Sequence, residues 1–241
     1  QQFIDNSSET LNMNMDIDDN GIIEPLELGS SQLWSNGRLT SWTTSYWTGS
    51  YWSSSGLSGE IPESIGNLTN LTFINLTLNQ LTGELPESIG ELTNLTFISV
   101  PYNSLTGDIP NEIGNLTNLT YLSLYDNQFG CKIVENPEDP WFTDDCEEYC
   151  NGSNGCIGEI PESIGNLTNI TSSLLLMGNH LRGEIPESIG NLINLNGLDL
   201  HKNRLSGEIP GNICNIYSNI IYGPSYTDNQ LCPPYPECLT E

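Results

Sequence analysis

The clearest metal-binding pattern in the sequence lies near the start of the chain, in DIDDNGIIEPLE, residues 16–27. This segment matches the calcium-loop pattern D-x-[DN]-x-[DN]-G-x5-E at every constrained position. Calcium takes roughly six to eight oxygen ligands in a flexible shell. The pattern predicts one structural calcium ion. Its ligands would be the side chains of Asp16, Asp18, Asn20, Glu24 and Glu27 and the backbone carbonyl of Ile22. The alternative is a solvated acidic turn without metal.

A second chemical pattern is asparagine two residues before serine or threonine, which is the acceptor site for N-linked glycans in secreted proteins. It occurs at ten positions, Asn6, Asn67, Asn70, Asn75, Asn94, Asn115, Asn118, Asn151, Asn166 and Asn169. Most of them lie in a repeated phrase, GNLTNLT, which could be a repeat consensus that carries no sugar. Because Asn6, Asn75 and Asn151 lie outside that phrase, we expect N-linked glycans at several of these sites.

Cysteines form two groups, which are Cys131, Cys146, Cys150 and Cys156, followed by Cys214, Cys232 and Cys238. No histidine stands beside them at metal-ligand spacing, so they predict disulfides formed in an oxidising compartment. Their odd number leaves one thiol free or bonded to another chain. A chain that begins with Gln1 instead of methionine also fits a processed product. We therefore expect a secreted, extracellular protein.

Charge limits the partners that this chain can have. The net charge is -26, with 31 acidic residues and only five basic ones, Arg38, Lys132, Arg182, Lys202 and Arg204. Such a chain repels nucleic acids and anionic membranes, and its expected partners are metal ions or basic proteins. No apolar run reaches the ~18 residues of a membrane helix, so we expect no membrane insertion. Neither His180 nor His201 can be matched with a nucleophile, so we expect no enzyme.

These residues must be positioned by a repeated element. The phrase GEIPESIGNLTNLT begins at Gly59, and related copies begin at positions 83, 107, 158, 183 and 207. In the pattern L-x-L-x-x-N-x-L the asparagine recurs every 24 residues at Asn79, Asn103 and Asn127, and again at Asn179 and Asn203. A fixed period of this length predicts a solenoid. Glycine and proline in every period exclude long helices.

Each coil is expected to contribute one short strand to a parallel sheet. The expected strands are Ile74–Leu76, Ile98–Val100, Leu122–Leu124, Leu174–Leu176 and Leu198–Leu200. The asparagines that follow these strands should be buried, where their amides would bond backbone groups of their own and adjacent coils.

The repeat resembles the plant-type leucine-rich repeat, L-x-x-L-x-x-L-x-L-x-x-N-x-L-x-G-x-I-P-x-x-I-G, over roughly residues 57–215. That family includes polygalacturonase-inhibiting proteins and receptor-kinase ectodomains. The ending NQLCPPYPEC, residues 229–238, is similar to the C-terminal caps of that family and of secreted algal and protist relatives. The resemblance implies an α/β-type solenoid dominated by β-structure, wound as a right-handed superhelix. Its concave side would be a parallel sheet, and its convex side would consist of 3₁₀ and irregular turns. An extra short strand would lie near G-x-I-P.

The domain boundaries follow from the repeat. We expect an N-terminal cap at 1–56 with the calcium loop and a tryptophan-rich segment, repeats at 57–215, and a C-terminal cap at 216–241. The tryptophans Trp34, Trp42, Trp47 and Trp52 could cover the first coil. A cysteine-rich insertion at 131–157 interrupts the repeats, and its four cysteines allow three pairings. The insertion is either a surface projection held in place by disulfides, with no further role, or a contact for a partner through Trp141 and Phe142.

Outward positions of the concave sheet are the candidates for binding. Strand alternation places Asn75 there, together with Phe73, Phe97, Tyr102, Tyr121, Tyr125, Met177 and His201. An aromatic row of this kind is typical of a binding patch, although it could also pack a glycan or a neighbouring subunit.

Three functions fit the sequence. In the first, the protein is an extracellular structural or adhesive building block that associates with itself, for example as a head-to-tail fibre, because its repeats are nearly uniform and one cysteine is unpaired. In the second, the concave face recognises an extracellular protein or polysaccharide, as the resemblance implies. In the third, threonine columns bind ice; the two columns are Thr69, Thr93, Thr117 and Thr168, and Thr72, Thr96, Thr120 and Thr171.

Overall fold

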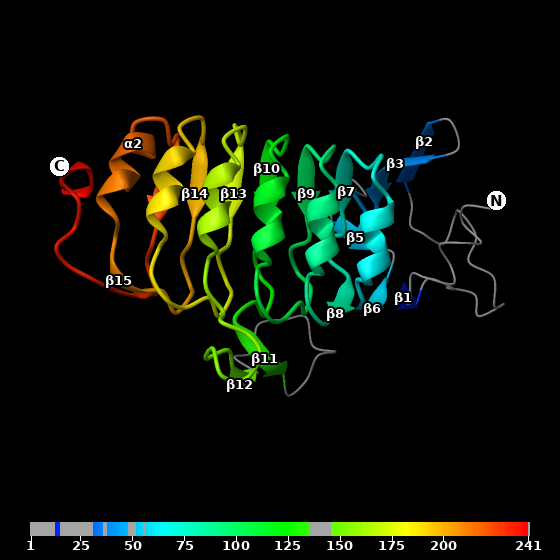
Figure 1. Ribbon diagram of the computed structural model, residues 1–241, viewed down its shortest axis with the longest axis horizontal. Coiled ribbons are helices and arrows are strands. Elements are labelled where there is room, and N and C mark those ends of the chain that lie inside the picture. The colour runs from blue at the N-terminus through cyan, green and yellow to red at the C-terminus, as the bar shows by residue number, and fades with distance from the viewer. Residues whose placement is uncertain are drawn as a thin grey trace.

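The structure, a computed structural model, describes residues 13–14, 31–35, 38–47, 52–54, 56–134 and 146–240. Over these ranges the chain winds into coils that stack along one axis, with strands on one side and short helices on the other (Figure 1). The predicted solenoid is therefore confirmed.

One long sheet runs along the stack. Its eight strands have the spatial order β16-β14-β13-β10-β9-β7-β3-β2. All neighbours from β3 to β16 are parallel, and β2 pairs antiparallel with β3 at the N-terminal edge. The strands are β2 (Ser31–Ser35), β3 (Arg38–Thr43), β7 (Phe73–Asn75), β9 (Phe97–Ser99), β10 (Tyr121–Ser123), β13 (Ser173–Leu175), β14 (Gly197–Asp199) and β16 (Tyr222–Ser225).

The opposite side carries one short helix in each coil. These are the 3₁₀ helices η1 (Glu63–Asn67), η2 (Glu87–Glu91), η3 (Asn111–Asn115), η4 (Glu162–Asn166), η5 (Glu187–Asn191), η6 (Gly211–Ile213) and η7 (Glu237–Leu239), with the short α-helix α2 (Cys214–Tyr217). A proline precedes each 3₁₀ helix, and its carbonyl accepts the first bond, as from Ile65 N to Pro62 O at 2.9 Å. Coils pack closely here, since a Cβ at Gly90 would lie 2.6 Å from the Glu112 carbonyl oxygen.

Short strands also form beside the main sheet, as the repeat class implies. Parallel pairs join β6 (Ser58–Glu60) with β8 (Gln80–Thr82) and β15 (Ser206–Glu208) with β17 (Gln230–Cys232). Single parallel bridges, Glu84 to Thr106 and Glu159 to Arg182, continue this row in the middle coils. The remaining strands pair antiparallel: β1 (Met13–Asn14) with β6, β4 (Ser45–Trp47) with β5 (Trp52–Ser54), and β11 (Cys131–Val134) with β12 (Cys146–Tyr149).

The core is a continuous spine of leucine and isoleucine between the sheet and the helices, and most of its side chains are fully buried. Beside it runs a ladder of asparagines, Asn79, Asn103, Asn127, Asn179 and Asn203, each at most 8 % exposed. Asn127 shows the pattern: its Oδ1 accepts a bond from Leu105 N, and its Nδ2 donates to the carbonyls of Val100, Leu124 and Tyr125. The predicted ladder is thus confirmed.

The strands begin one residue earlier than the leucine spacing predicted. The predicted strand Ile74–Leu76 is β7, Phe73–Asn75, and the others shift likewise. Ile74 and Leu76 both point into the core, each 2 % exposed. The prediction placed the start of each strand at its first buried residue. The hydrogen bonds between neighbouring strands begin one residue earlier, at the outward-facing residue.

Both ends of the sheet extend into the segments expected to be caps. Trp42 lies in β3 opposite Ile74 and is 1 % exposed, so it does cover the first coil. Thr44 continues the ladder there, because its hydroxyl accepts a bond from Asn79 Nδ2 at 2.7 Å. At the C-terminal end, Asn229 bonds Leu205 N and the Leu200 carbonyl as a further ladder member.

Candidate functional site

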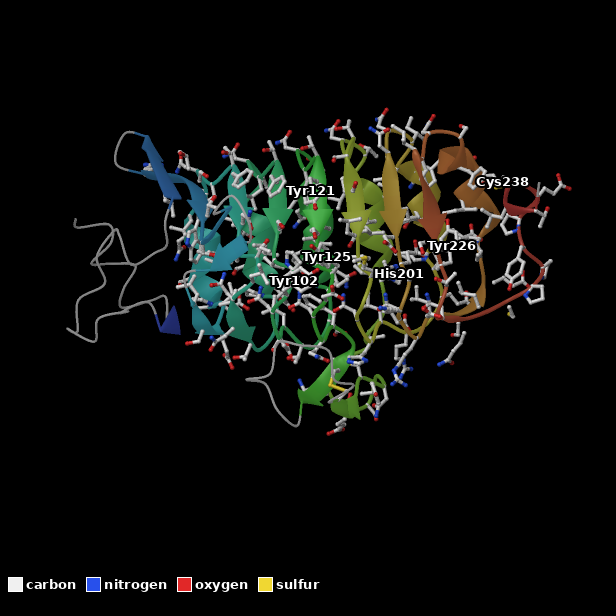
Figure 2. The ribbon with its side chains drawn as sticks, turned by 180° about the vertical axis from the view of Figure 1, so that it is seen from behind. Tyr102, Tyr121, Tyr125, His201, Tyr226 and Cys238 are labelled. Carbon is white, nitrogen blue, oxygen red and sulfur yellow. A yellow bond between two sulfur atoms is a disulfide. The ribbon has the colours of Figure 1, made fainter. Side chains whose placement is uncertain are left out.

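The most distinctive surface is the outer side of the eight-stranded sheet, which we call the sheet face (Figure 2). Phe73, Phe97 and Tyr121 occupy the same outward position in β7, β9 and β10, and all three are half-buried. Their rings stack in a row, with centroids 4.3 Å and 4.6 Å apart and planes tilted by 6° and 9°. Parallel strand register therefore converts a repeated sequence position into a continuous aromatic ridge.

A second group of side chains lies beyond the strand ends on the same face. Tyr102 and Tyr125 pack edge to face, with ring centroids 5.1 Å apart. Met177 and His201 occupy the position of Tyr125 in the following coils, and both are half-buried. The structure thus brings all the aromatic candidates, with Met177 and His201, to one face.

Asn75 also points outward, as strand alternation predicted, and stands beside Phe73 in β7. Its Oδ1 accepts bonds from Thr77 N at 3.1 Å and Thr77 Oγ1 at 2.6 Å. A glycan on Asn75 would stand at the N-terminal end of the sheet face and leave the coils of β10, β13 and β14 open.

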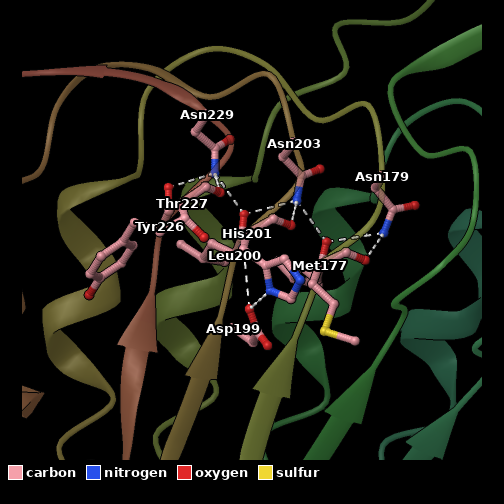
Figure 3. A network of polar contacts seen from close by, with 10 residues as sticks. Met177, Asn179, Asp199, Leu200, His201, Asn203, Tyr226, Thr227 and Asn229 are labelled. Atoms are coloured by element: carbon pink, nitrogen blue, oxygen red, sulfur yellow. Dashed lines mark hydrogen bonds and ion pairs between the residues drawn. The ribbon is translucent and has the colours of Figure 1, made fainter. Parts of the chain in front are cut away.

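Two carboxylates on this face escaped the sequence analysis. Asp199, the last residue of β14, accepts a bond from His201 Nδ1 at 2.5 Å (Figure 3). Asp126 follows Tyr125, and burial raises the pKa of its carboxyl from 3.8 to about 6, while Lys202 and His201 oppose this rise. The signal was available, because both acids occupy variable positions inside the L-x-L-x-x-N pattern, but acids are too frequent in this chain to single them out.

The GNLTNLT phrase builds a second set of bonds between coils, on the edge where the helices lead back to the strands. The amides of Asn94, Asn118 and Asn169 donate to Thr69 O, Thr93 O and Thr117 O at 2.7–2.9 Å. Hydroxyls of the next column also bond across coils, from Thr72 to Thr40 O, Thr96 to Thr72 O and Thr120 to Thr96 O. The phrase therefore has a structural use whether or not it carries sugar.

The remaining acceptor sites differ in their surroundings. Asn67, Asn115 and Asn166 are exposed at the ends of their 3₁₀ helices. Asn151 is exposed in the insertion, and its Oδ1 accepts a bond from Ser153 Oγ at 2.6 Å. Asn70 is half-buried, and Asn6 falls in a part of the chain that the structure does not describe.

The cysteine-rich insertion is pinned by two disulfides, Cys131–Cys146 and Cys150–Cys156. It rests on cationic side chains of the repeats: the Arg204 guanidinium lies 3.9 Å from the centre of the Tyr149 ring, and Arg182 donates to the Cys150 carbonyl at 2.6 Å. A third disulfide joins Cys214 to Cys238, and Cys232 is the exposed cysteine left over from the seven, all of which are described.

A groove of 810 Å³ lies between this insertion and the helix side of the repeats. The acids of several GEIPE phrases line it, namely Glu84, Glu87, Asp108, Glu112, Glu159, Glu162, Glu184 and Glu187. Asp108 is engaged in structure, since its Oδ1 accepts bonds from Ile157 N and Gly158 N. The cluster Asp108, Cys150 and Cys156 offers no thiolate ligand, because both cysteines are in a disulfide.

Several expectations fall in parts of the chain outside the described ranges. These are the calcium loop at 16–27 and the possible partner contacts Trp141 and Phe142. For Trp34, Trp47 and Trp52 only the backbone is described, in β2, β4 and β5.

Comparison with known proteins agrees with the fold. The Leucine Rich Repeat family model matches residues 70–92, 94–116, 172–192 and 194–216. The repeats and the stacked coils together define a leucine-rich-repeat solenoid. No curated protein matches the sequence.

Among solved structures, the chain is similar to a plant peptide hormone receptor, RGFR1 in complex with RGF2, at 35 % identity and a TM-score of 0.61 over 76 % of this chain. It is also similar to PEPR1 in the PEPR1–AtPEP1 structure, at 30 % identity and a TM-score of 0.53 over 76 % of this chain. A pollen receptor kinase 3 shares the fold over 97 % of this chain and 96 % of its own, with 22 % identity and a TM-score of 0.65. The chain spans about a quarter of the first two receptor chains, 24 % and 25 %.

Within the described part of the chain, no helix has the length and apolar character needed to cross a bilayer. The disulfides and the receptor ectodomains that resemble the chain indicate an extracellular setting.

Proposed function

We propose that the protein is a secreted recognition module that binds an extended polypeptide segment across its sheet face. The observation that carries this proposal is the aromatic ridge, Phe73–Phe97–Tyr121, standing half-exposed beside the Tyr102–Tyr125 pair. Aromatic side chains are enriched at protein interfaces, where they supply large contact area at low entropic cost. A basic or neutral partner suits the net charge of -26.

The comparisons support this choice of partner. Two similar structures are complexes: a plant peptide hormone receptor, RGFR1, with RGF2 at 35 % identity, and PEPR1 with AtPEP1 at 30 % identity. Those receptor chains are about three times as long as this chain, so their ligands are not assigned to it.

A polysaccharide partner fits the ridge less well. Sugars pack against the faces of aromatic rings, whereas neighbouring rings here cover one another's faces at 4.3–4.6 Å and present their edges. Ring edges carry partial positive charge and suit backbone carbonyls and other aromatic groups.

Self-association is the main alternative, and no described feature supports a fibre beyond the exposed Cys232. For ice binding, Thr72, Thr96 and Thr120 use their hydroxyls to bond the preceding coil, so that column does not offer a free row of donors. Both alternatives therefore rank below recognition.

The sequence patterns add two further proposals. One calcium ion would be held by residues 16–27, and N-linked glycans would be carried at several of the ten acceptor sites. Support for both is the pattern of residue types, with the exposure of Asn67, Asn115, Asn151 and Asn166 supporting the second.

The experiment is selection of random twelve-residue peptides on the intact protein at pH 7.5. Selected peptides should bind Phe97→Ser at least tenfold more weakly, about 1.4 kcal/mol, and should bind Tyr217→Ser normally. Tyr217 is the matched control, because it is an aromatic residue 39 % exposed in α2, away from the sheet face. Failure to select any peptide, or equal loss in both variants, would overturn the proposal.

A further inference from the structure

Asp126 has an unusual position for an acid in this molecule. It follows Tyr125 on the sheet face and adopts a left-handed backbone conformation with φ of 52°. Its carboxyl is pressed against the next coil, since a Cβ built on Gly178 would lie 2.0 Å from Asp126 Oδ1. Among the described residues, none donates a hydrogen bond to either carboxylate oxygen of Asp126. Its backbone N–H donates to the carbonyl of Met177.

An acid that is half-buried and lacks a donor is held in an unfavourable charged state. Burial is the largest cause that raises its pKa to about 6, and Asp199 adds to the rise. The charged groups around it are Lys202 and His201, which lower the pKa, and Asp199, which is itself bonded to His201 at 2.5 Å. Tyr125 precedes Asp126 in the same coil, and Tyr102, which packs against Tyr125, occupies the position of Asp126 in the preceding coil.

Lys202 does not neutralise Asp126 by contact. It is exposed and forms no ion pair within 4.0 Å in the described part of the chain, although it occupies the same left-handed position two coils on. The site thus joins a desolvated carboxylate, a second carboxylate and an aromatic pair, in a chain whose charge attracts cations.

We propose that Asp126, assisted by Asp199, forms a subsite that receives one lysine or arginine side chain of the bound polypeptide and releases it when the medium is acidified. This inference rests on the proposed function, of which it specifies the partner chemistry. A cation at Asp126 would supply the donor that the carboxylate lacks, and charge-assisted bonds of this kind are the stronger ones.

Acid release follows from the sign of the shift. The subsite attracts a cation only while Asp126 is ionised, and its ionised fraction falls as pH drops through about 6. Affinity for a cationic peptide is therefore expected to be full near pH 7.5 and to fall severalfold near pH 5.

The test uses the intact protein with ¹³C-labelled aspartate carboxyls and two probes, N-acetyl-arginine methylamide and its neutral counterpart N-acetyl-citrulline methylamide. The arginine probe should lower the measured pKa of Asp126 by about half a unit, which means roughly threefold tighter binding to the ionised form. The citrulline probe should leave it unchanged. Asp228 serves as the control resonance, because it is exposed and has the same left-handed backbone, with φ of 56°.

Variants then separate this inference from the proposed function. Asp126→Asn, which suits a left-handed position, should weaken arginine-containing selected peptides about tenfold at pH 7.5 and remove the loss of binding near pH 5. Asp228→Asn should change neither. If Phe97→Ser weakens binding but Asp126→Asn does not, recognition stands and the subsite is wrong.

Two other results would also overturn the subsite. Equal shifts at Asp126 and Asp228 would mean general attraction of cations to an acidic protein. A rise in the Asp126 pKa in Lys202→Gln, with no effect of the arginine probe on the wild type, would mean that Lys202 is already its counter-ion.

Discussion

At the scale of single residues, the structural role of an asparagine or aspartate in this protein depends on how exposed its side chain is. The ladder asparagines satisfy buried backbone groups, as Asn127 does for Leu105 N and three carbonyls. The amide of Asn118, in the same coil, makes one exposed bond to Thr93 O. Asp126 is half-buried without such partners among the described residues, which is why its ionised form is disfavoured.

Substitution of the two asparagines should separate these roles. Asn127→Ala leaves buried backbone groups unpaired and should lower the free energy of unfolding by about 3 kcal/mol. Asn118→Ala is the matched control and should lower it by less than ~1 kcal/mol, because water can replace its exposed bond. Urea denaturation measures both. Equal costs would contradict the view that the first ladder is the structural one.

The raised pKa of Asp126 predicts how this residue affects the free energy of unfolding at different pH values. Its pKa is raised from 3.8 to about 6 in the folded protein, so between these values the unfolded chain loses its proton first. The contribution of Asp126 to the stability of the wild type should therefore fall as pH rises through this window. Relative to wild type, Asp126→Asn should gain about 1 kcal/mol at pH 7.5, a figure discounted for solvent screening, and nothing at pH 3.5. Denaturation at the two pH values measures this difference, and a gain of equal size at both would refute it.

At the scale of elements, the short strand of each coil positions the candidate residues. Parallel pairing places Phe73, Phe97 and Tyr121 in one register. A second repeat position, just beyond the strands, carries Tyr125, Met177 and His201. The repeat period predicted this much, because one position per coil must recur on one face. It also predicted the buried asparagines, and the resemblance to the plant-type repeat implied the extra strand near G-x-I-P.

What the sequence could not predict depends on contacts between coils. Ring stacking at 4.3 Å, the closeness of Asp126 to Gly178, and the choice of Cys131–Cys146 and Cys150–Cys156 among three pairings all arise from three-dimensional packing. The strand starts shifted by one residue because leucine spacing marks burial and not hydrogen bonding. The role of GNLTNLT in bonds between coils was hidden by its likeness to a glycan acceptor.

The calcium loop is the element whose chemistry is most specific in the sequence. Glu27→Gln removes the bidentate carboxylate and should weaken calcium binding at least tenfold, about 1.4 kcal/mol. Asp19→Asn makes the same charge change within the loop at a position that supplies no ligand in the pattern, and should bind normally. Calorimetric titration of calcium into chelator-treated protein measures both. Absence of binding in the wild type would favour the solvated acidic turn.

At the scale of the whole molecule, recognition and self-association predict different assemblies. A recognition module should sediment as a monomer of 26.5 kDa plus any glycan, at all concentrations, with or without a reducing agent. Growth of the sedimenting species with concentration would support a fibre. If growth occurs only without a reducing agent and disappears in Cys232→Ser, the cause is a disulfide through the exposed Cys232.

The central claim is that the sheet face is where the partner binds, and aromatic ¹³C–¹H NMR of the intact protein tests it most directly. When a selected peptide is added, the ring signals of Phe73, Phe97 and Tyr121 should shift together, because the three rings are in contact. Signals of Tyr217 and Tyr235, exposed near the C-terminal end, should stay in place. Shifts confined to Tyr217 and Tyr235, with the ridge unchanged, would contradict the account.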